Sequence, residues 1–117
     1  MQTSPISPTP QLRSGRALPA SRSSSETPIR VLIGDADGEF RRALRASFAA
    51  DPRIEVVGEA DDGAQALELL RWLRPDVALV DEDMPSFGGA AIARVIGSEL
   101  PETRVVVLTR PTAGARR

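Results

Sequence analysis

Three polar residues that could act together each follow an apolar segment of the chain: Asp35, Asp81 and Thr109. In a parallel sheet, side chains just past the C-terminal ends of the strands converge on a crevice, and open α/β folds bind their ligands there. Residues 77–81 are the clearest case, because an unbroken apolar run of strand length suits burial on both faces and ends in a carboxylate. Any metal bound in such a crevice must be a hard cation held by oxygen, since the chain has neither Cys nor His.

The composition limits the classes of protein to which the chain can belong. Its 117 residues, of which 26% are charged and 41% hydrophobic, predict one small globular domain. No apolar run approaches the roughly 20 residues of a membrane-spanning helix, and a net charge of -1 gives no electrostatic case for nucleic-acid binding. The absence of Cys and His excludes disulfides, zinc sites and histidine acid-base catalysis. All 15 basic residues are arginines.

The chain is predicted to have three parts. Residues 1–27 are rich in Ser, Pro, Thr and Arg with little to bury, which favours a disordered tail or an over-extended start site. This segment lacks the apolar core of a secretory signal, and its prolines interrupt the amphipathic helix of an organelle transit peptide, the less favoured interpretation. Residues 28–109 form the predicted domain, and residues 110–117 form a short C-terminal tail.

From residue 28 onward, strand and helix signals alternate. Asp37 and Asp62 are predicted to cap two of the helices, the second in a capping-box pattern with Gln65. Strict alternation with short loops implies a parallel sheet with right-handed crossovers. The expected strands are residues 29–34, 54–58, 77–81 and 104–109, and the third helix is residues 90–100.

Five short sequence words stand in a fixed order between residues 29 and 109. They are Ile29-Arg30-Val31-Leu32-Ile33, Ile54-Glu55-Val56-Val57-Gly58-Glu59-Ala60, Arg74-Pro75-Asp76-Val77, Asp81-Glu82-Asp83-Met84-Pro85 and Pro101-Glu102-Thr103-Arg104-Val105-Val106-Val107-Leu108-Thr109. Together they resemble the receiver domain of two-component response regulators, particularly receivers with a helix-turn-helix output domain. The resemblance implies a flavodoxin-like α/β fold with a doubly wound parallel sheet.

The resemblance also implies a chemistry for the strand ends. By position, Asp81 is the phosphoacceptor, which takes a phosphoryl group from a phosphohistidine on a sensor histidine kinase. A carboxylate attacking an already negative phosphoryl group is repelled, so Mg²⁺ is expected to screen both groups. The family pattern places this Mg²⁺ on Asp35, Asp81 and the backbone carbonyl of Asp83, and makes Thr109 the switch hydroxyl. The alternative for Thr109 is a β-branched residue that simply ends a strand.

The first departure from the family pattern is Ala36. It stands where receivers carry the second acidic residue of the first loop, and a methyl group cannot coordinate a metal. Asp37 is one candidate for the missing ligand, although metal binding would compete with its predicted role as a helix cap. The carboxylate of Asp83 could compensate for the missing ligand in part. We therefore expect weakened Mg²⁺ affinity.

The second departure lies after Thr109, where only eight residues follow. A complete receiver continues with a fourth helix, a fifth strand bearing a lysine, and a fifth helix. The expected strand order is therefore 2-1-3-4, with the fifth strand and last helices missing. This order leaves residues 105–108 as an apolar edge, which invites aggregation, a homodimer or a partner that carries the missing output. A truncated gene product is one interpretation of the chain.

Two function classes follow from these observations. The first is a phosphoacceptor receiver located in the cytoplasm. It is expected to catalyse no reaction other than its own phosphorylation, and to bind neither nucleic acid nor membrane directly. The second is a degenerate receiver that serves only as a protein-interaction module or has no function. A dinucleotide-binding domain ranks third, because residues 34–38 lack the required glycine spacing and carry charges of the wrong sign.

Overall fold

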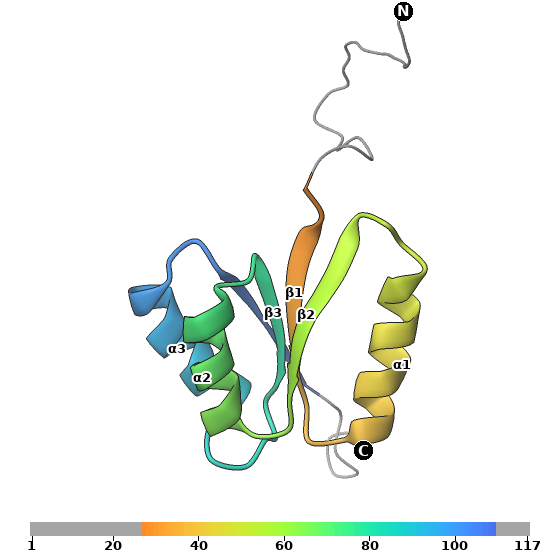
Figure 1. Ribbon diagram of the computed structural model, residues 1–117. Coiled ribbons are helices and arrows are strands. Elements are labelled where there is room, and N and C mark those ends of the chain that lie inside the picture. Colours follow the sequence, from red (N-terminus) through yellow and green to blue (C-terminus); the bar gives the residue numbers. More distant parts are fainter. Residues whose placement is uncertain (1–26, 110–117) are drawn as a thin grey trace, which may run out of the picture.

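In the computed structural model, which describes residues 27–109, four strands alternate with three helices (Figure 1). The predicted tails lie outside the described residues, apart from Thr27. No helix in the described part of the chain is long and apolar enough to span a membrane. The elements are β1 (Ile29–Gly34), α1 (Gly38–Ala49), β2 (Ile54–Ala60), α2 (Gly63–Leu73), β3 (Val77–Asp81), α3 (Gly89–Glu99) and β4 (Arg104–Leu108).

The four strands form one parallel sheet in the order β2-β1-β3-β4. This order confirms the predicted flavodoxin-like topology, in which the chain reverses its winding direction after β2. β2 continues two residues beyond the predicted Gly58, because its pairing with β1 extends as far as Gly34 opposite Ala60. The register shifts once in this pair, between Val31 and Leu32.

The helices cover the two faces of the sheet unequally. Figure 1 shows α2 and α3 on one side and α1 alone on the other. The core lies under α2 and α3, where Leu32 and Val80 of the sheet pack with Leu70, Ile92 and Ile96 of the helices. All five side chains are fully buried.

The opposite face of the sheet is less well covered. α1 has no fully buried residue, and its contacts with the sheet are mainly with β2. Far from α1, Val106 of β4 is 38% exposed. Among the described residues, β4 pairs only with β3, so its outer edge has no partner strand. Within the described residues, β4 therefore forms the apolar sheet edge that the sequence predicts at residues 105–108.

The helix boundaries follow from local chemistry. The carboxylate of Asp37 accepts hydrogen bonds from the backbone N–H groups of Glu39 (3.0 Å) and Phe40 (3.2 Å), as an N-cap residue does. Asp62 accepts from the N–H of Gln65 at 2.8 Å and caps α2 in the same way. α2 ends at Leu73, and its C-cap residue Arg74 has a left-handed φ of 47° directly before a proline.

One buried hydroxyl ties the loop before β4 to the loop before β3. Thr103 is buried, and its Oγ1 donates a hydrogen bond of 2.7 Å to the carbonyl of Pro75. Thr103→Val keeps the shape but removes the donor, so we expect a loss of about 1–2 kcal/mol in the free energy of unfolding. Urea denaturation measures this loss, with the exposed helical Ser98→Ala as a control expected to change stability by only a few tenths of a kcal/mol. Equal stability of Thr103→Val and wild type would contradict this role.

Candidate functional site

Two of the predicted site residues lie next to each other at the same edge of the sheet. The register pairs Gly34 of β1 with Val80 of β3, so Asp35 and Asp81 follow at the ends of adjacent strands. Neighbouring strands are about 4.8 Å apart. Asp35 is 1% exposed and Asp81 is 3% exposed, so two acidic side chains are buried at one point. The two strand ends therefore bring together two buried carboxyl groups, whose oxygens are the kind of donor that a hard cation takes.

The loop after β1 is folded by hydrogen bonds between its own aspartates. The carboxylate of Asp35 accepts a hydrogen bond of 2.8 Å from the backbone N–H of Asp37. The carboxylate of Asp37 in turn caps α1, and its side chain is exposed. Ala36, between them, is exposed and contributes only a methyl group. Capping therefore engages Asp37, the candidate substitute for the second acidic ligand.

The loop after β3 is tied to the neighbouring strand and helix. The carboxylate of Asp81 accepts a hydrogen bond of 3.3 Å from the backbone N–H of Asp83. The N–H of Glu82 donates to the carbonyl of Leu108 at 2.9 Å and joins this loop to the end of β4. Asp83 is exposed.

Glu82 has a role that the sequence reasoning missed. Its carboxylate accepts a hydrogen bond of 2.8 Å from the N–H of Ala90 in the first turn of α3. The N-cap of this helix is Gly88, which has no side chain with which to cap it. The missing capping residue was the available signal, because the first N–H groups of a helix need an acceptor from elsewhere. Glu82 thus joins the loop after Asp81 to α3.

Two glycines let the loop after Asp81 pack closely. A Cβ on Gly63, at the start of α2, would lie 2.2 Å from the carbonyl oxygen of Phe87, and one on Gly88 would lie 2.3 Å from that of Glu82. The N–H of Gly63 also donates to the carbonyl of Pro85 at 2.8 Å. These contacts hold the loop after Asp81 against the start of α2.

Thr109 lies beyond the end of β4 rather than within the strand as predicted. The register places Leu108 opposite Asp81, so Thr109 is the next residue along at the same edge of the sheet. It is exposed.

The residues present supply oxygen donors for a hard cation, but few of them. Asp35 and Asp81 offer carboxylates, and the carbonyl of Asp83 lies in the same loop as Asp81. Such donors suit Mg²⁺, which binds proteins through one or two carboxylates and keeps several waters. Within residues 27–109, however, no three His, Cys, Asp or Glu side chains are grouped so that they could hold a metal ion. The site therefore fits Mg²⁺ chemically while providing a sparse ligand set.

The clearest pKa shifts in the described residues lie elsewhere. A hydrogen bond from the Arg53 side chain lowers the pKa of Asp51, in the turn between α1 and β2. A hydrogen bond from Arg71 lowers the pKa of Glu99, at the end of α3. Both pairs are exposed, so solvent screens them and they add little to stability.

The parallel order and the buried acidic strand ends define a flavodoxin-like α/β domain with an anionic site at the sheet edge. Comparison with known proteins gives its family. The family model of the response regulator receiver domain matches residues 31–115. The chain therefore belongs to the response regulator receiver domain family, as the sequence words predicted.

Individual relatives agree with this assignment. The chain is 45% identical to a probable transcriptional regulatory protein NarL of Mycobacterium tuberculosis, over 69% of this chain and 38% of that protein. It is 40% identical to a protein-glutamate methylesterase/protein-glutamine glutaminase of Koribacter versatilis, over 77% of this chain and 25% of that protein. The solved receiver domain of the M. tuberculosis NarL superimposes with a TM-score of 0.71 at 37% identity, covering 77% of this chain and 73% of that one.

These alignments place the chain within two-component signalling. It is a receiver domain of the kind found in response regulators, and its fold and sequence agree on this point. The chain spans only 38% and 25% of the lengths of the two curated relatives. The transcriptional and methylesterase activities in their names are therefore properties of those longer proteins.

Proposed function

We propose that Asp81 accepts a phosphoryl group from a sensor histidine kinase. The observation that supports this most directly is the buried pair of Asp81 and Asp35 at adjacent strand ends. In the transfer, a carboxylate oxygen of Asp81 forms a bond to phosphorus as the phosphorus–nitrogen bond of the phosphohistidine breaks. The electron pair of that bond remains on the imidazole, and the product is an acyl phosphate.

Asp35, Asp81 and the carbonyl of Asp83 would hold Mg²⁺ in this reaction. When bound, the ion neutralises charge on the phosphoryl oxygens and on the attacking carboxylate. Ala36 supplies no ligand and Asp37 caps α1, so we propose an affinity below that of a receiver with two acidic residues in this loop. Mg²⁺ binding would therefore depend most on the buried carboxylate of Asp35.

Thr109 would act after the transfer. Its hydroxyl lies one residue beyond the pairing of Leu108 with Asp81 and would donate a hydrogen bond to the attached phosphoryl group. The 117 residues contain no lysine, so any positive side chain that this sequence places beside the phosphoryl group must be an arginine. Thr109→Ala would still allow phosphoryl transfer to Asp81 but would remove the hydrogen bond that responds to the phosphoryl group.

The chain's wider setting is also part of the proposal. Its partner in phosphotransfer is a histidine kinase, and the edge of β4, which has no partner strand within residues 27–109, suits a homodimer or a partner that carries an output domain. We propose a cytoplasmic location, no direct contact with nucleic acid or membrane, and no enzymatic activity on other substrates.

Incubation with acetyl phosphate and Mg²⁺ tests the acceptor role. We expect intact-protein mass spectrometry to show a gain of about 80 Da, the mass of one phosphoryl group, and peptide mapping to place it on Asp81. Asp81→Ala should abolish the gain. Asp61→Asn is the matched control, because Asp61 directly follows neighbouring β2 but is exposed and does not adjoin β3.

A degenerate receiver is the second candidate function, and Ala36 is the residue that favours it. If the folded protein gains no mass at any Mg²⁺ concentration, the domain works only through protein interaction or has no function. Circular dichroism on the same sample establishes that the chain is folded, so that this outcome is not confused with unfolding.

A further inference from the structure

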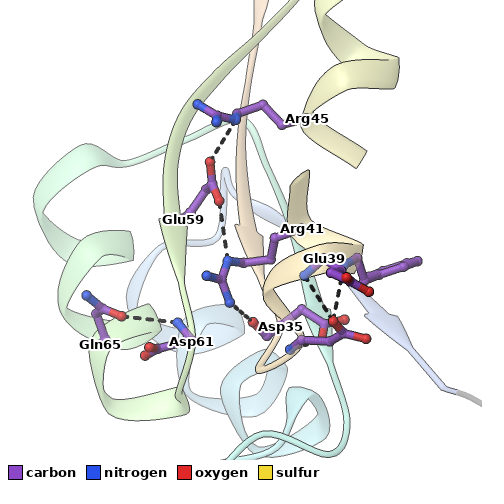
Figure 2. Close-up of polar contacts among 9 residues, drawn as sticks. Asp35, Glu39, Arg41, Arg45, Glu59, Asp61 and Gln65 are labelled. Carbon is purple, nitrogen blue, oxygen red and sulfur yellow. Dashed lines mark hydrogen bonds and ion pairs between the residues drawn. The ribbon is translucent and has the colours of Figure 1, made fainter. Parts of the chain in front are cut away.

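We propose that Arg41 of α1 is a positioning residue that holds the Asp35 loop in its cation-binding conformation. This inference rests on the proposed function. The guanidinium of Arg41 reaches in two directions (Figure 2). Its Nη1 donates a hydrogen bond to the backbone carbonyl of Asp35, and its Nε donates to a carboxylate oxygen of Glu59 at 3.3 Å.

Glu59 provides a fixed anchor for this contact. It belongs to β2 and is paired with Ile33 of β1, one residue before the end of each strand. Its other carboxylate oxygen lies 3.1 Å from Nε of Arg45, one turn further along α1. The side chains of Arg41 and Glu59 are only 20% and 27% exposed, whereas that of Arg45 is 59% exposed. Arg41 therefore joins α1, β2 and the loop after β1 through a largely shielded group.

The contact acts on the residue whose carboxylate is needed at the site. Asp35 folds its side chain back onto the N–H of Asp37, so the direction of its carboxylate depends on the orientation of the backbone between them. A guanidinium that donates from a rigid plane to two acceptors fixes such a peptide group better than a flexible ammonium does. Ala36 adds no polar side chain to hold the loop, which makes the anchor on the Asp35 carbonyl more important.

Arg45 is the matched control for this role. It stands on the same helix, carries the same charge and pairs with the same Glu59, but the hydrogen bond to the Asp35 carbonyl comes from Arg41. Arg41→Ala and Arg45→Ala therefore remove equal charge near the site. A difference between them reports what Arg41 contributes beyond its charge, which is the hydrogen bond to the Asp35 carbonyl and the closer packing of its less exposed side chain.

Amide hydrogen exchange in the full chain tests the effect on the loop. The reporter is the N–H of Asp37, which is bonded to the carboxylate of Asp35. We expect this amide to exchange about tenfold faster in Arg41→Ala than in Arg45→Ala, with Arg41→Lys in between, because exchange follows local opening. Equal exchange in the two alanine variants overturns the proposal. If Arg41→Ala does not fold, the same comparison is made between Arg41→Lys and Arg45→Lys, and equal rates there overturn it as well.

A Mg²⁺ titration followed by the amide chemical shifts of residues 35–37 and 81–83 tests the consequence for binding. We expect Arg41→Ala to require about fivefold more Mg²⁺ for half-saturation and Arg45→Ala to stay within about twofold of wild type, as a loss of preorganisation predicts. If both variants bind Mg²⁺ more tightly than wild type, and by the same factor, the arginines act only by repelling the cation through their charge. That result is contrary to the proposal. Wild-type protein that binds no Mg²⁺ and gains no phosphoryl group defeats the proposed function, whereas the Asp37 exchange comparison still decides the role of Arg41.

Discussion

Ala36→Asp is expected to lower the Mg²⁺ concentration for half-maximal phosphoryl uptake by about tenfold, or about 1.4 kcal/mol in binding free energy. The substitution adds a carboxylate to the exposed loop between Asp35 and Asp37, next to a site with few side-chain ligands. Cation affinity in oxygen-ligand sites rises with the charge and number of the ligands. The initial rate of the mass gain from acetyl phosphate, measured over a Mg²⁺ series, gives the midpoint.

The same variant has a second signature. Without Mg²⁺, an added negative charge beside Asp35 and Asp81 should lower the melting temperature, and saturating Mg²⁺ should more than restore it, since a ligand that binds only the folded state stabilises it. Ala36→Asn has a similar size and no charge, so its gain in affinity should be smaller. Equal midpoints for Ala36→Asp and wild type would show that Ala36 is not what limits cation binding.

Gly63→Ala is expected to cost about 3 kcal/mol of stability, because overpacking a close contact forces the backbone to move. The added Cβ would lie 2.2 Å from the carbonyl oxygen of Phe87 and 2.6 Å from its backbone nitrogen. Neither atom belongs to a flexible side chain, so the loop after Asp81 must shift. Phosphoryl uptake should fall on the order of 100-fold, as a displacement of about 1 Å can cause.

Gly97→Ala is the matched control for this substitution. Gly97 is an exposed residue of α3, and a Cβ there meets nothing within 4 Å. Alanine should therefore stabilise the helix by about 0.5–1 kcal/mol and leave phosphoryl uptake unchanged. Urea unfolding and the acetyl phosphate assay together check both variants. A Gly63→Ala protein with wild-type stability and uptake would show that the close packing of this loop is not required.

Much of the fold could be predicted because its signals are local. Short apolar runs that end in a polar residue predicted all four strands, and the sheet order followed from the resemblance to receivers. Asp37 and Asp62 were recognised as helix caps from their spacing to the residues that they cap, and the structure confirms both. The prediction failed mainly at strand ends, as where β2 continues to Ala60, because pairing with the neighbouring strand rather than propensity decides where a strand stops.

The candidate site was predicted in part for the same reason. The sequence predicts that Asp35 and Asp81 lie close together, because the C-terminal ends of adjacent parallel strands must meet at one edge of the sheet. The roles proposed for Asp81, Asp83 and Thr109 came from the resemblance alone and await the experiments above. The sequence by itself determined which residue types reach this edge and that no histidine, cysteine or lysine is among them.

The tertiary structure alone decided how those residues are held. Glu82 caps a helix eight residues away, Gly63 must lack a side chain because Phe87 packs against it, and Arg41 reaches Glu59 from another element. None of these contacts follows from local periodicity, because each depends on the distance between segments that only the packed sheet and helices establish. Local sequence fixes backbone conformation through short-range sterics and hydrogen bonding, whereas support for the site comes from contacts that exist only after the elements have packed.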